Sequence, residues 1–269
     1  MATADKLRKL LETKNKLKQA LINKGVDVAD TDSFDSYVGK IDSITTSSTV
    51  SMPDYLSEVE YTHMKSGTNA SGFPIPYVPN VKTKLEMEFA ITGYSTTATN
   101  QNRQVFGSYT GTSGDNVFGL LVNKSGVLTS TWGTVLVNRK YCSMIAPKTN
   151  TIYTIVMDNN GTTLDGTVYP VQGLETTEAL ADDWVADNPF WIFPAGNVSV
   201  SYVAYIKIYS AKIYEDNALK HDIIPVKHKV SGNYGLYDKV TGGYFESTAY
   251  IQNYTGGSEV DNDEWGDEW

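Results

Sequence analysis

The amino-acid sequence predicts a mainly β protein, an antiparallel β-sandwich preceded by a short α-helical segment. Hydrophobic residues make up 41% of its 269 residues and charged residues only 20%, with 18 Tyr and 22 Gly, which favours strands and turns over a helical bundle. Between residues 104 and 155, alternating segments recur between turns marked by Gly and Asn. Helical periodicity is confined to the first 44 residues.

Residues 1–44 are predicted to form a helical attachment or oligomerisation segment. Apolar residues recur at helical spacing from residue 5 to residue 23, and a second short helix is predicted in 32–44 with Asp32 or Ser33 as its N-cap. Because such a helix is marginal alone in water, we expect its apolar face to be buried on copies of itself, on another assembly or on the next segment. The residues expected to make these contacts are Leu7, Leu10, Leu11, Leu17, Leu21, Phe34, Tyr37 and Ile41.

A polar linker is predicted at residues 45–52, and it separates the helices from a sandwich domain at residues 53–255. In that domain Leu85, Met87 and Phe89 alternate with charged residues, which predicts a strand with one buried and one solvated face. Tight hairpin turns are predicted at 123–126 and 159–161, where Asn and Gly tolerate positive φ.

Residues 204–246 contain the clearest strand pattern. Strict alternation in Ile206–Tyr214 predicts a strand that is covered on both sides for part of its length, and Glu215–Asn217 has turn chemistry. The next strand, Asp222–Val226, is predicted to stop or to run along a sheet edge at Pro225, because proline lacks the donor that a ladder needs. A compact hairpin rich in Tyr and Gly follows.

This stretch resembles the closing segment of the concanavalin A-like (laminin-G-like) jelly-roll domains of bacteriophage tail and fibre proteins and of gut-bacterial surface proteins. The matching strings are KIYSAKIY at Lys207–Tyr214, IP at Ile224-Pro225 and GLYDKVTGGYF at Gly235–Phe245. The amino-terminal pattern is similar to the helical adaptor modules of phage tail and neck-appendage proteins. The resemblance implies a jelly-roll fold, which hosts lectins, hydrolases and structural modules alike.

Two functions follow from the resemblance. The first is a structural virion appendage protein, a phage fibre or a tail or head decoration, that displays a lectin-like jelly roll with host-surface glycan as its candidate ligand. It implies contact with other virion proteins, assembly in the host cytoplasm and a homo-oligomer, with a trimer expected. The alternative is a bacterial surface carbohydrate-binding protein or glycoside hydrolase of this fold. The amino terminus lacks the apolar region of a signal peptide, which favours the first function.

The sequence predicts no enzyme. A glycosidase of this fold needs paired carboxylates on one face, and Glu86 and Glu88 share a face. The third carboxylate of the family pattern is missing from Phe89–Ile91, and Lys82 and Lys84 flank the pair. We therefore expect an ordinary exposed strand here.

No cofactor or metal is expected. Cys142 stands alone and is predicted to be a small buried hydrophobe, and the three histidines lack metal-ligand spacing: His63, His221 and His228. Calcium ligation at Asp115-Asn116 or at residues 158–160 competes with ordinary turn chemistry, which is the favoured interpretation. A net charge of −9 argues against nucleic acid as a partner, and no window of about 18 apolar residues exists for membrane insertion.

Aromatic rings beside amide or carboxyl groups are the candidates for glycan binding, namely Tyr94, Tyr109 and Trp132, of which Trp132 is also a plausible core residue. Trp184 and Trp191 lie in apolar surroundings and are assigned structural roles. The final segment, 256–269, contains six Asp/Glu and no base. It is predicted to be either a solvated tail or a docking peptide whose Trp265 and Trp269 enter pockets on a partner.

Overall fold

The computed structural model of the chain covers the sandwich and its amino-terminal helix. It describes residues 3–23, 28–29, 31–37, 40, 50–65, 72–94, 102–108, 116–134, 140–173, 180, 182–193, 204–246 and 254–260.

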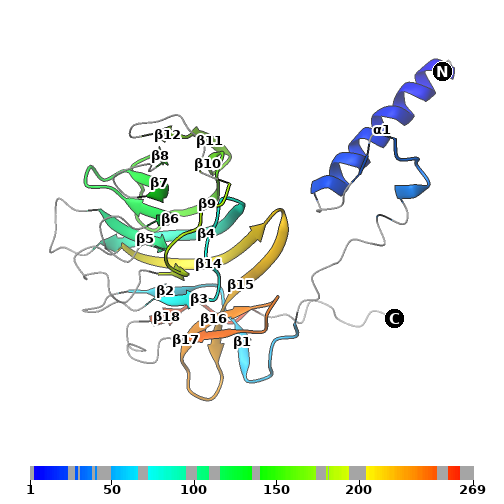
Figure 1. Cartoon of the computed structure of the whole chain (residues 1–269). Coiled ribbons are helices and arrows are strands. Elements are labelled where there is room, and N and C mark those ends of the chain that lie inside the picture. The colour runs from blue at the N-terminus through cyan, green and yellow to red at the C-terminus, as the bar shows by residue number, and fades with distance from the viewer. Residues whose placement is uncertain are drawn as a thin grey trace.

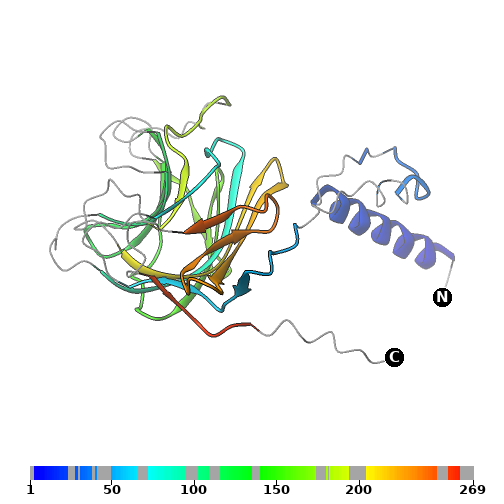
Figure 2. The same cartoon turned by 90° about the horizontal axis from the view of Figure 1, so that it is seen from below.

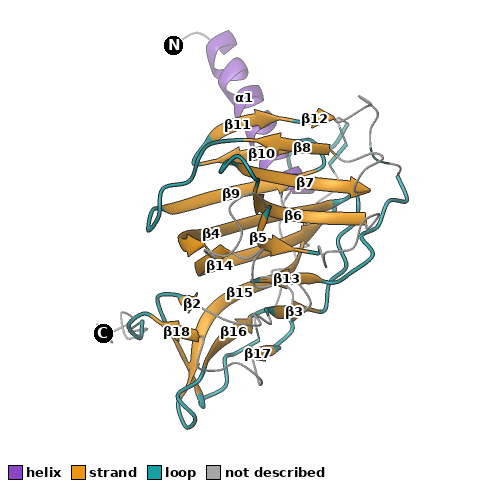
Figure 3. Cartoon of the chain, turned by 90° about the vertical axis from the view of Figure 1, so that its left-hand side faces the viewer, coloured by secondary structure: helices purple, strands orange, loops and turns teal. Residues whose placement is uncertain are grey.

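Two antiparallel sheets account for the strands of these residues (Figures 1 and 3). The eleven-stranded sheet contains β1 (Leu56–Glu58), β2 (Thr62–Met64), β4 (Thr83–Tyr94), β9 (Ile152–Asp158), β10 (Gly161–Leu164), β11 (Thr167–Pro170), β14 (Ala204–Glu215), β15 (Ala218–His228), β16 (Tyr234–Asp238), β17 (Tyr244–Glu246) and β18 (Tyr254–Gly256). The seven-stranded sheet contains β3 (Phe73–Ile75), β5 (Arg103–Gly107), β6 (Asn116–Val122), β7 (Leu128–Thr134), β8 (Lys140–Ser143), β12 (Gln172–Gly173) and β13 (Phe190–Ile192). Its strand order is β12-β8-β7-β6-β5-β13-β3.

The core lies between the two sheets. In β4 the side chains of Leu85, Met87 and Phe89 are buried while the alternate positions are half-exposed, as the alternation predicts. Phe89 meets Phe106 of the opposite sheet edge-to-face, with ring centroids 5.8 Å apart. The predicted antiparallel jelly-roll β-sandwich preceded by an amino-terminal helix is therefore confirmed.

Strands β14 and β15 form the long hairpin at the centre of the eleven-stranded sheet. Asp216 and Asn217 have positive φ, so the predicted turn is confirmed. The prediction for Pro225 was wrong, because β15 continues to His228 and pairs with β16 from Ile223 to Lys227. The carbonyl oxygen of Pro225 accepts a hydrogen bond from the N–H of Val59. On this side of β15 the neighbouring strand changes from β14 to β1. Since N–H and C=O of one strand residue point the same way, the missing donor falls at this junction.

Helix α1 (Thr3–Asn23) stands to one side of the sandwich (Figures 1 and 2). The carboxyl-terminal half of its apolar face is covered by the next segment, where Leu21, Val28 and Tyr37 form a small buried cluster with Leu17 beside it. Leu21 and Tyr37 are therefore not available for the predicted oligomer contacts, since their own chain already buries them. Phe34 remains exposed at the side of this cluster.

The second predicted helix is described only in part. Residues 36, 37 and 40 are helical, and the hydroxyl of Ser33 accepts a hydrogen bond from the N–H of Ser36, so Ser33 is the N-cap. Ile41 lies outside the described residues. No helix in the described part of the chain combines the length and apolarity needed to cross a membrane.

The chain enters the sandwich beside the place where its carboxyl-terminal segment leaves it. The hydroxyl of Tyr237 lies 3.1 and 3.0 Å from the carbonyl oxygens of Val50 and Ser51, which fixes the entering segment on β16. On the leaving side, the N–H of Val260 donates to the carbonyl of Glu58 in β1. Both ends are thus attached close to β1.

Candidate functional site

The candidate site lies on the outward face of the seven-stranded sheet, which is turned toward the viewer in Figure 3. Strand register places one outward residue from each strand in a continuous line, called here the cross-strand row. It consists of Pro74, Trp191, Gly107, Gly119, Thr131, Tyr141 and Gln172.

Alternation along the strands fixes which way this row points. Phe118, Ser130 and Trp132 point into the sandwich core, so Gly119 and Thr131 between them point outward. Trp191 and Tyr141 are both half-buried, and their backbone positions lie four strand positions apart, or about 19 Å at the usual strand spacing. The row therefore has small residues in its middle, all three of them buried (Gly107, Gly119 and Thr131), and a half-buried aromatic ring toward each end.

The middle of the row depends on two glycines that pair across β5 and β6. A Cβ on Gly107 would lie 2.4 Å from the carbonyl oxygen of Phe118, and one on Gly119 would lie 2.6 Å from that of Phe106. Gly107 also has φ +133°, which side chains rarely adopt. The close approach of these backbones, at a β-bulge in β5, explains why no side chain fills the middle of the row.

Two polar groups on this face are buried without a partner. Thr131 is 4% exposed and Gln104, in the adjacent row, is 5% exposed. Neither Thr131 Oγ1 nor Gln104 Oε1 has a hydrogen-bond partner among the described residues, although Gln104 Nε2 donates to the carbonyl of Gly107. A buried polar atom left without a partner costs about 1 to 3 kcal/mol. Neither oxygen is accessible to solvent in this structure, so a bound hydroxyl or water reaches them only after the residues that cover this part of the sheet move.

The predicted glycan residues do not belong to this row. Trp132 is 1% exposed in the core, so its ring is not available for stacking, and that prediction was wrong. Tyr94 packs against the core with the guanidinium of Arg103 over its ring at 5.1 Å, and burial raises the pKa of its hydroxyl. Tyr109 lies outside the described residues. Trp184 is buried as predicted, with its Nε1 donating to Asn116.

Trp191 was assigned a structural role, and it does pack against the core cluster, although its ring is only half-buried; Tyr141 was not singled out. Trp191 lies between two buried residues of β13, and this apolar context led to a structural assignment. A usable signal was present in the alternation itself, because the neighbours of Trp191 on both sides are core residues and the middle residue must point outward.

The carboxylates considered for hydrolysis lie on the outward face of the other sheet. Glu86 pairs with Lys84 at 2.8 Å and accepts from the hydroxyl of Tyr214 at 3.2 Å, while Glu88 lies opposite Ser210. The Lys84 ammonium also lies 4.5 Å from the centre of the Tyr214 ring. The pair is thus part of a half-exposed network of cross-strand contacts.

His63 is a further titratable group on that outward face, and its pKa is perturbed. Burial, together with the charges of Lys207 and Lys65, lowers its pKa to about 4. Its Nε2 lies 2.9 Å from the hydroxyl of Thr92, and its neighbour Tyr61 has the Lys207 ammonium 4.0 Å from the ring centre. His63 is therefore neutral at pH 7.

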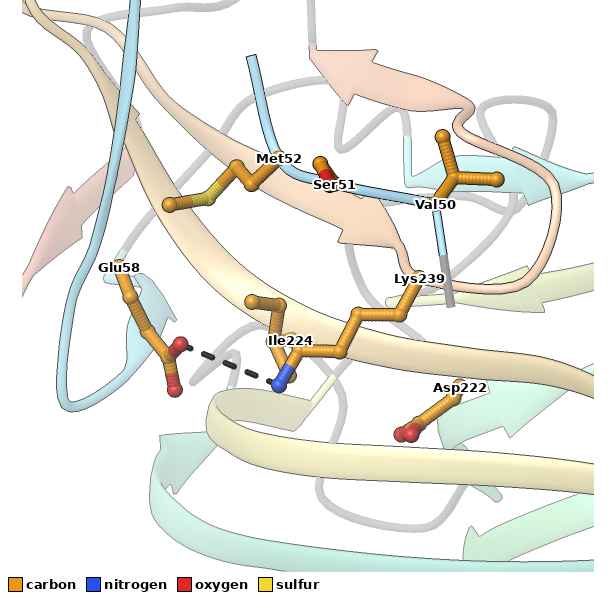
Figure 4. Close-up of a pocket in the computed structure, with 7 residues that line it drawn as sticks. All are labelled: Val50, Ser51, Met52, Glu58, Asp222, Ile224 and Lys239. Carbon is orange, nitrogen blue, oxygen red and sulfur yellow. Dashed lines mark ion pairs between the residues drawn. The ribbon is translucent and has the colours of Figure 1, made fainter. Parts of the chain in front are cut away.

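A pocket of about 420 Å³ lies where the chain enters the sandwich (Figure 4). It is lined by Val50, Ser51, Met52, Glu58, Asp222, Ile224 and Lys239. The Lys239 ammonium lies 3.9 Å from Glu58, and Asp222 adds a second carboxylate to the lining. Within the described residues no group of three or more His, Cys, Asp or Glu is placed to hold a metal ion.

Cys142 is fully buried in the core near Ser130 and Thr162. Burial raises the pKa of its thiol, which agrees with the predicted role as a small hydrophobe.

No protein-family model matches the sequence, and no curated protein matches it. Among solved structures, the chain is similar to the CBM40 of a Ruminococcus gnavus IT-sialidase bound to α2,3 sialyllactose, at 14% identity and TM-score 0.36 over 58% of this chain and 92% of that one. A Trypanosoma rangeli sialidase in complex with sialic acid matches at 13% identity and TM-score 0.40, over 60% of this chain and 26% of that one. A leech intramolecular trans-sialidase matches at 12% identity and TM-score 0.37, over 75% of this chain and 39% of that one.

These likenesses are too loose to assign a ligand or an activity. The fold rests on the sheet order and register described above, and the candidate site rests on the cross-strand row.

Proposed function

We propose that the sandwich is a carbohydrate-binding module whose ligand lies along the cross-strand row, and that it binds glycan without cleaving it. The observation that carries the proposal is the pairing of the Trp191 and Tyr141 rings with small residues between them. Aromatic rings stack on the apolar faces of sugars, and the small residues between the rings place no bulky side chain in the row. Because Gly107, Gly119 and Thr131 are buried, binding requires the residues that cover them to move aside.

Once the row is uncovered, the two buried oxygens supply its polar contacts. Thr131 Oγ1 and Gln104 Oε1 have no hydrogen-bond partner among the described residues, so a sugar hydroxyl that donates to either one satisfies an oxygen that is otherwise unpaired. Such groups supply orientation and specificity, while the rings supply most of the contact area.

We further propose that helix α1 attaches the module to a larger assembly. Leu7, Leu10 and Leu11 are exposed on the helix and are suited to such a contact. The resemblance to phage appendage proteins makes a virion the proposed assembly. Mass spectrometry of purified particles tests this part, and a protein found only in the soluble fraction would contradict it.

A matched pair of substitutions tests the binding site. Thr131→Val removes the unpartnered hydroxyl, so we expect unchanged or higher stability with about a five- to tenfold loss of glycan affinity. Thr129→Val is the control, because the Thr129 hydroxyl contacts Asn123 Nδ2 at 3.2 Å and Val127 O at 3.3 Å. We expect this control to lose stability by about 1 kcal/mol and to keep its affinity.

The measurement is a glycan array followed by calorimetric titration of a retained glycan. Trp191→Ala is expected to weaken binding about tenfold or more, the usual effect of losing an aromatic anchor. An array that retains no glycan, or Thr131→Val and Trp191→Ala variants that bind as tightly as the parent, would refute the proposed site. Release of reducing sugar by the parent chain would refute the non-catalytic assignment.

A further inference from the structure

The amino-terminal half of helix α1 carries an uncovered apolar surface. Leu7, Leu10 and Leu11, called here the leucine stripe, are 61%, 55% and 59% exposed. The next turns of the same face are covered by Val28 and Tyr37, so the stripe continues a surface that is already a packing surface. Exposed apolar patches of this kind mark contact sites.

The charge of the helix is opposite to that of the last residues of the chain. Helix α1 contains six Lys/Arg and two Asp/Glu. Residues 261–269 contain five Asp/Glu, no Lys or Arg, and both Trp265 and Trp269. The two segments thus match in both properties, because one offers apolar surface with positive charge and the other offers indole rings with negative charge.

The connections between the segments are long enough for them to meet within one chain. Val260 and Glu58 are joined by a backbone hydrogen bond, and Val50 enters beside Lys239, whose ammonium faces Glu58. Both segments therefore start from the neighbourhood of β1. The nine residues 41–49 that lead to the helical part and the nine residues 261–269 each span up to about 30 Å when extended.

We propose that the carboxyl-terminal segment, residues 261–269, docks on the leucine stripe of its own chain. Trp265 and Trp269 cover the leucines, and the acidic residues lie beside the Lys and Arg side chains of α1. An external partner of the stripe then competes with the tail, so the tail limits attachment until that partner is present. This docking is independent of glycan binding.

Contact quenching in the full-length chain tests the docking. A bimane fluorophore is placed on α1 through Glu12→Cys, at an exposed position, while Cys142 is fully buried and does not compete for the label. Indole rings quench bimane on contact. We expect about a twofold or greater rise in bimane fluorescence on Trp265→Phe/Trp269→Phe substitution, and a similar rise at about 0.5 M salt because screening weakens charge attraction.

A second variant examines the other side of the contact. Leu7→Gln, Leu10→Gln and Leu11→Gln together are expected to raise the fluorescence as much as the tail variant does, and glutamine is about as good a helix former as leucine at these exposed positions. Equal fluorescence in the parent chain and in both variants would overturn the proposal.

Quenching that grows between about 1 and 50 μM protein would also overturn it, because the tail would then be docking on a second copy.

Discussion

Asp238 is a buried charged group at the end of β16, before the turn to β17, and we expect it to contribute strongly to the stability of this part of the sandwich. It is fully buried, and its Oδ2 faces His221 Nδ1 at 2.7 Å and accepts from the Thr241 hydroxyl at 2.6 Å. Its Oδ1 accepts from the backbone N–H groups of Asp222 and Val240 at 3.0 and 3.1 Å. Four donors thus surround one carboxylate, and the Asp238→Asn substitution tests their joint contribution.

Asparagine keeps one oxygen for the two backbone N–H groups, but it loses the negative charge that all four partners contact. Its amide N–H₂ then faces the Thr241 hydroxyl and His221 Nδ1, which must both change from donor to acceptor. A hydrogen bond to a charged group contributes about 1.5 to 3 kcal/mol and one between neutral groups about 1 kcal/mol. Summed over the four bonds and reduced by relaxation, we expect Asp238→Asn to lower the free energy of unfolding by about 2 to 4 kcal/mol.

Urea unfolding followed by tryptophan fluorescence at pH 7 measures this loss. Asp165→Asn is the control: Asp165 is exposed, its Oδ1 accepts from the N–H of Thr154 at 2.8 Å, and its positive φ suits asparagine. We expect that control to lose less than about 1 kcal/mol. A loss of less than about 1 kcal/mol for Asp238→Asn itself would show that the four-donor argument is wrong.

The same carboxylate gives stability a dependence on acid pH. Burial opposes ionisation of Asp238, but the hydrogen bonds from His221, Thr241 and the Asp222 backbone outweigh it, so its pKa lies below the usual 3.8. Because the pKa of Asp238 is lower in the folded than in the unfolded chain, its stabilisation is fully present above the unfolded-state pKa. The stabilisation is lost as the pH falls through the folded-state pKa. The Asp238→Asn variant should lack this part of the acid-induced loss.

Two further predictions concern other sites. His63 has a folded pKa of about 4 against 6.5, so the unfolded chain binds its proton first as the pH falls. Stability should drop by about 1 to 2 kcal/mol between pH 7 and pH 4.5 after allowance for screening, and urea titrations of His63→Gln should show no such drop. Gly119→Ala should cost about 1 to 3 kcal/mol by thermal unfolding, because its Cβ would also approach Gly107 Cα at 2.9 Å. Gly93→Ala, whose nearest contact is 3.5 Å away, should not.

Local patterns were sufficient to predict the strands and tight turns. The turn at Asp216-Asn217 and the turn of Asn123–Gly126 follow from residues that tolerate positive φ, and both form as expected. Pro225 was assigned wrongly because a local rule treats both sides of a strand alike. The missing N–H of Pro225 matters only if a neighbouring strand needs it as a donor. Which strand lies beside Pro225 is determined by residues of β1, which are distant in the sequence.

The cross-strand row was not predictable from local pattern for the same reason. Trp191 and Gly119 are 72 positions apart in the sequence, and only the pairing of each with Gly107 places them side by side. Tyr37 presents the reverse case. Helical spacing correctly put it on an apolar face, but only the tertiary cluster with Leu21 and Val28 shows that this face is already occupied.

Because the entering segment at Val50 and the leaving segment at Val260 are both attached close to β1, the sandwich has its two connections on one side. A domain with this property can be inserted into a loop of another protein with little disturbance to the host. Joining residue 260 to residue 50 by a short bridge, and opening the chain at another exposed turn, should likewise give a circularly permuted sandwich that still folds. The module is therefore portable, and the same jelly roll can be carried on an amino-terminal helix, within a host loop or in tandem copies.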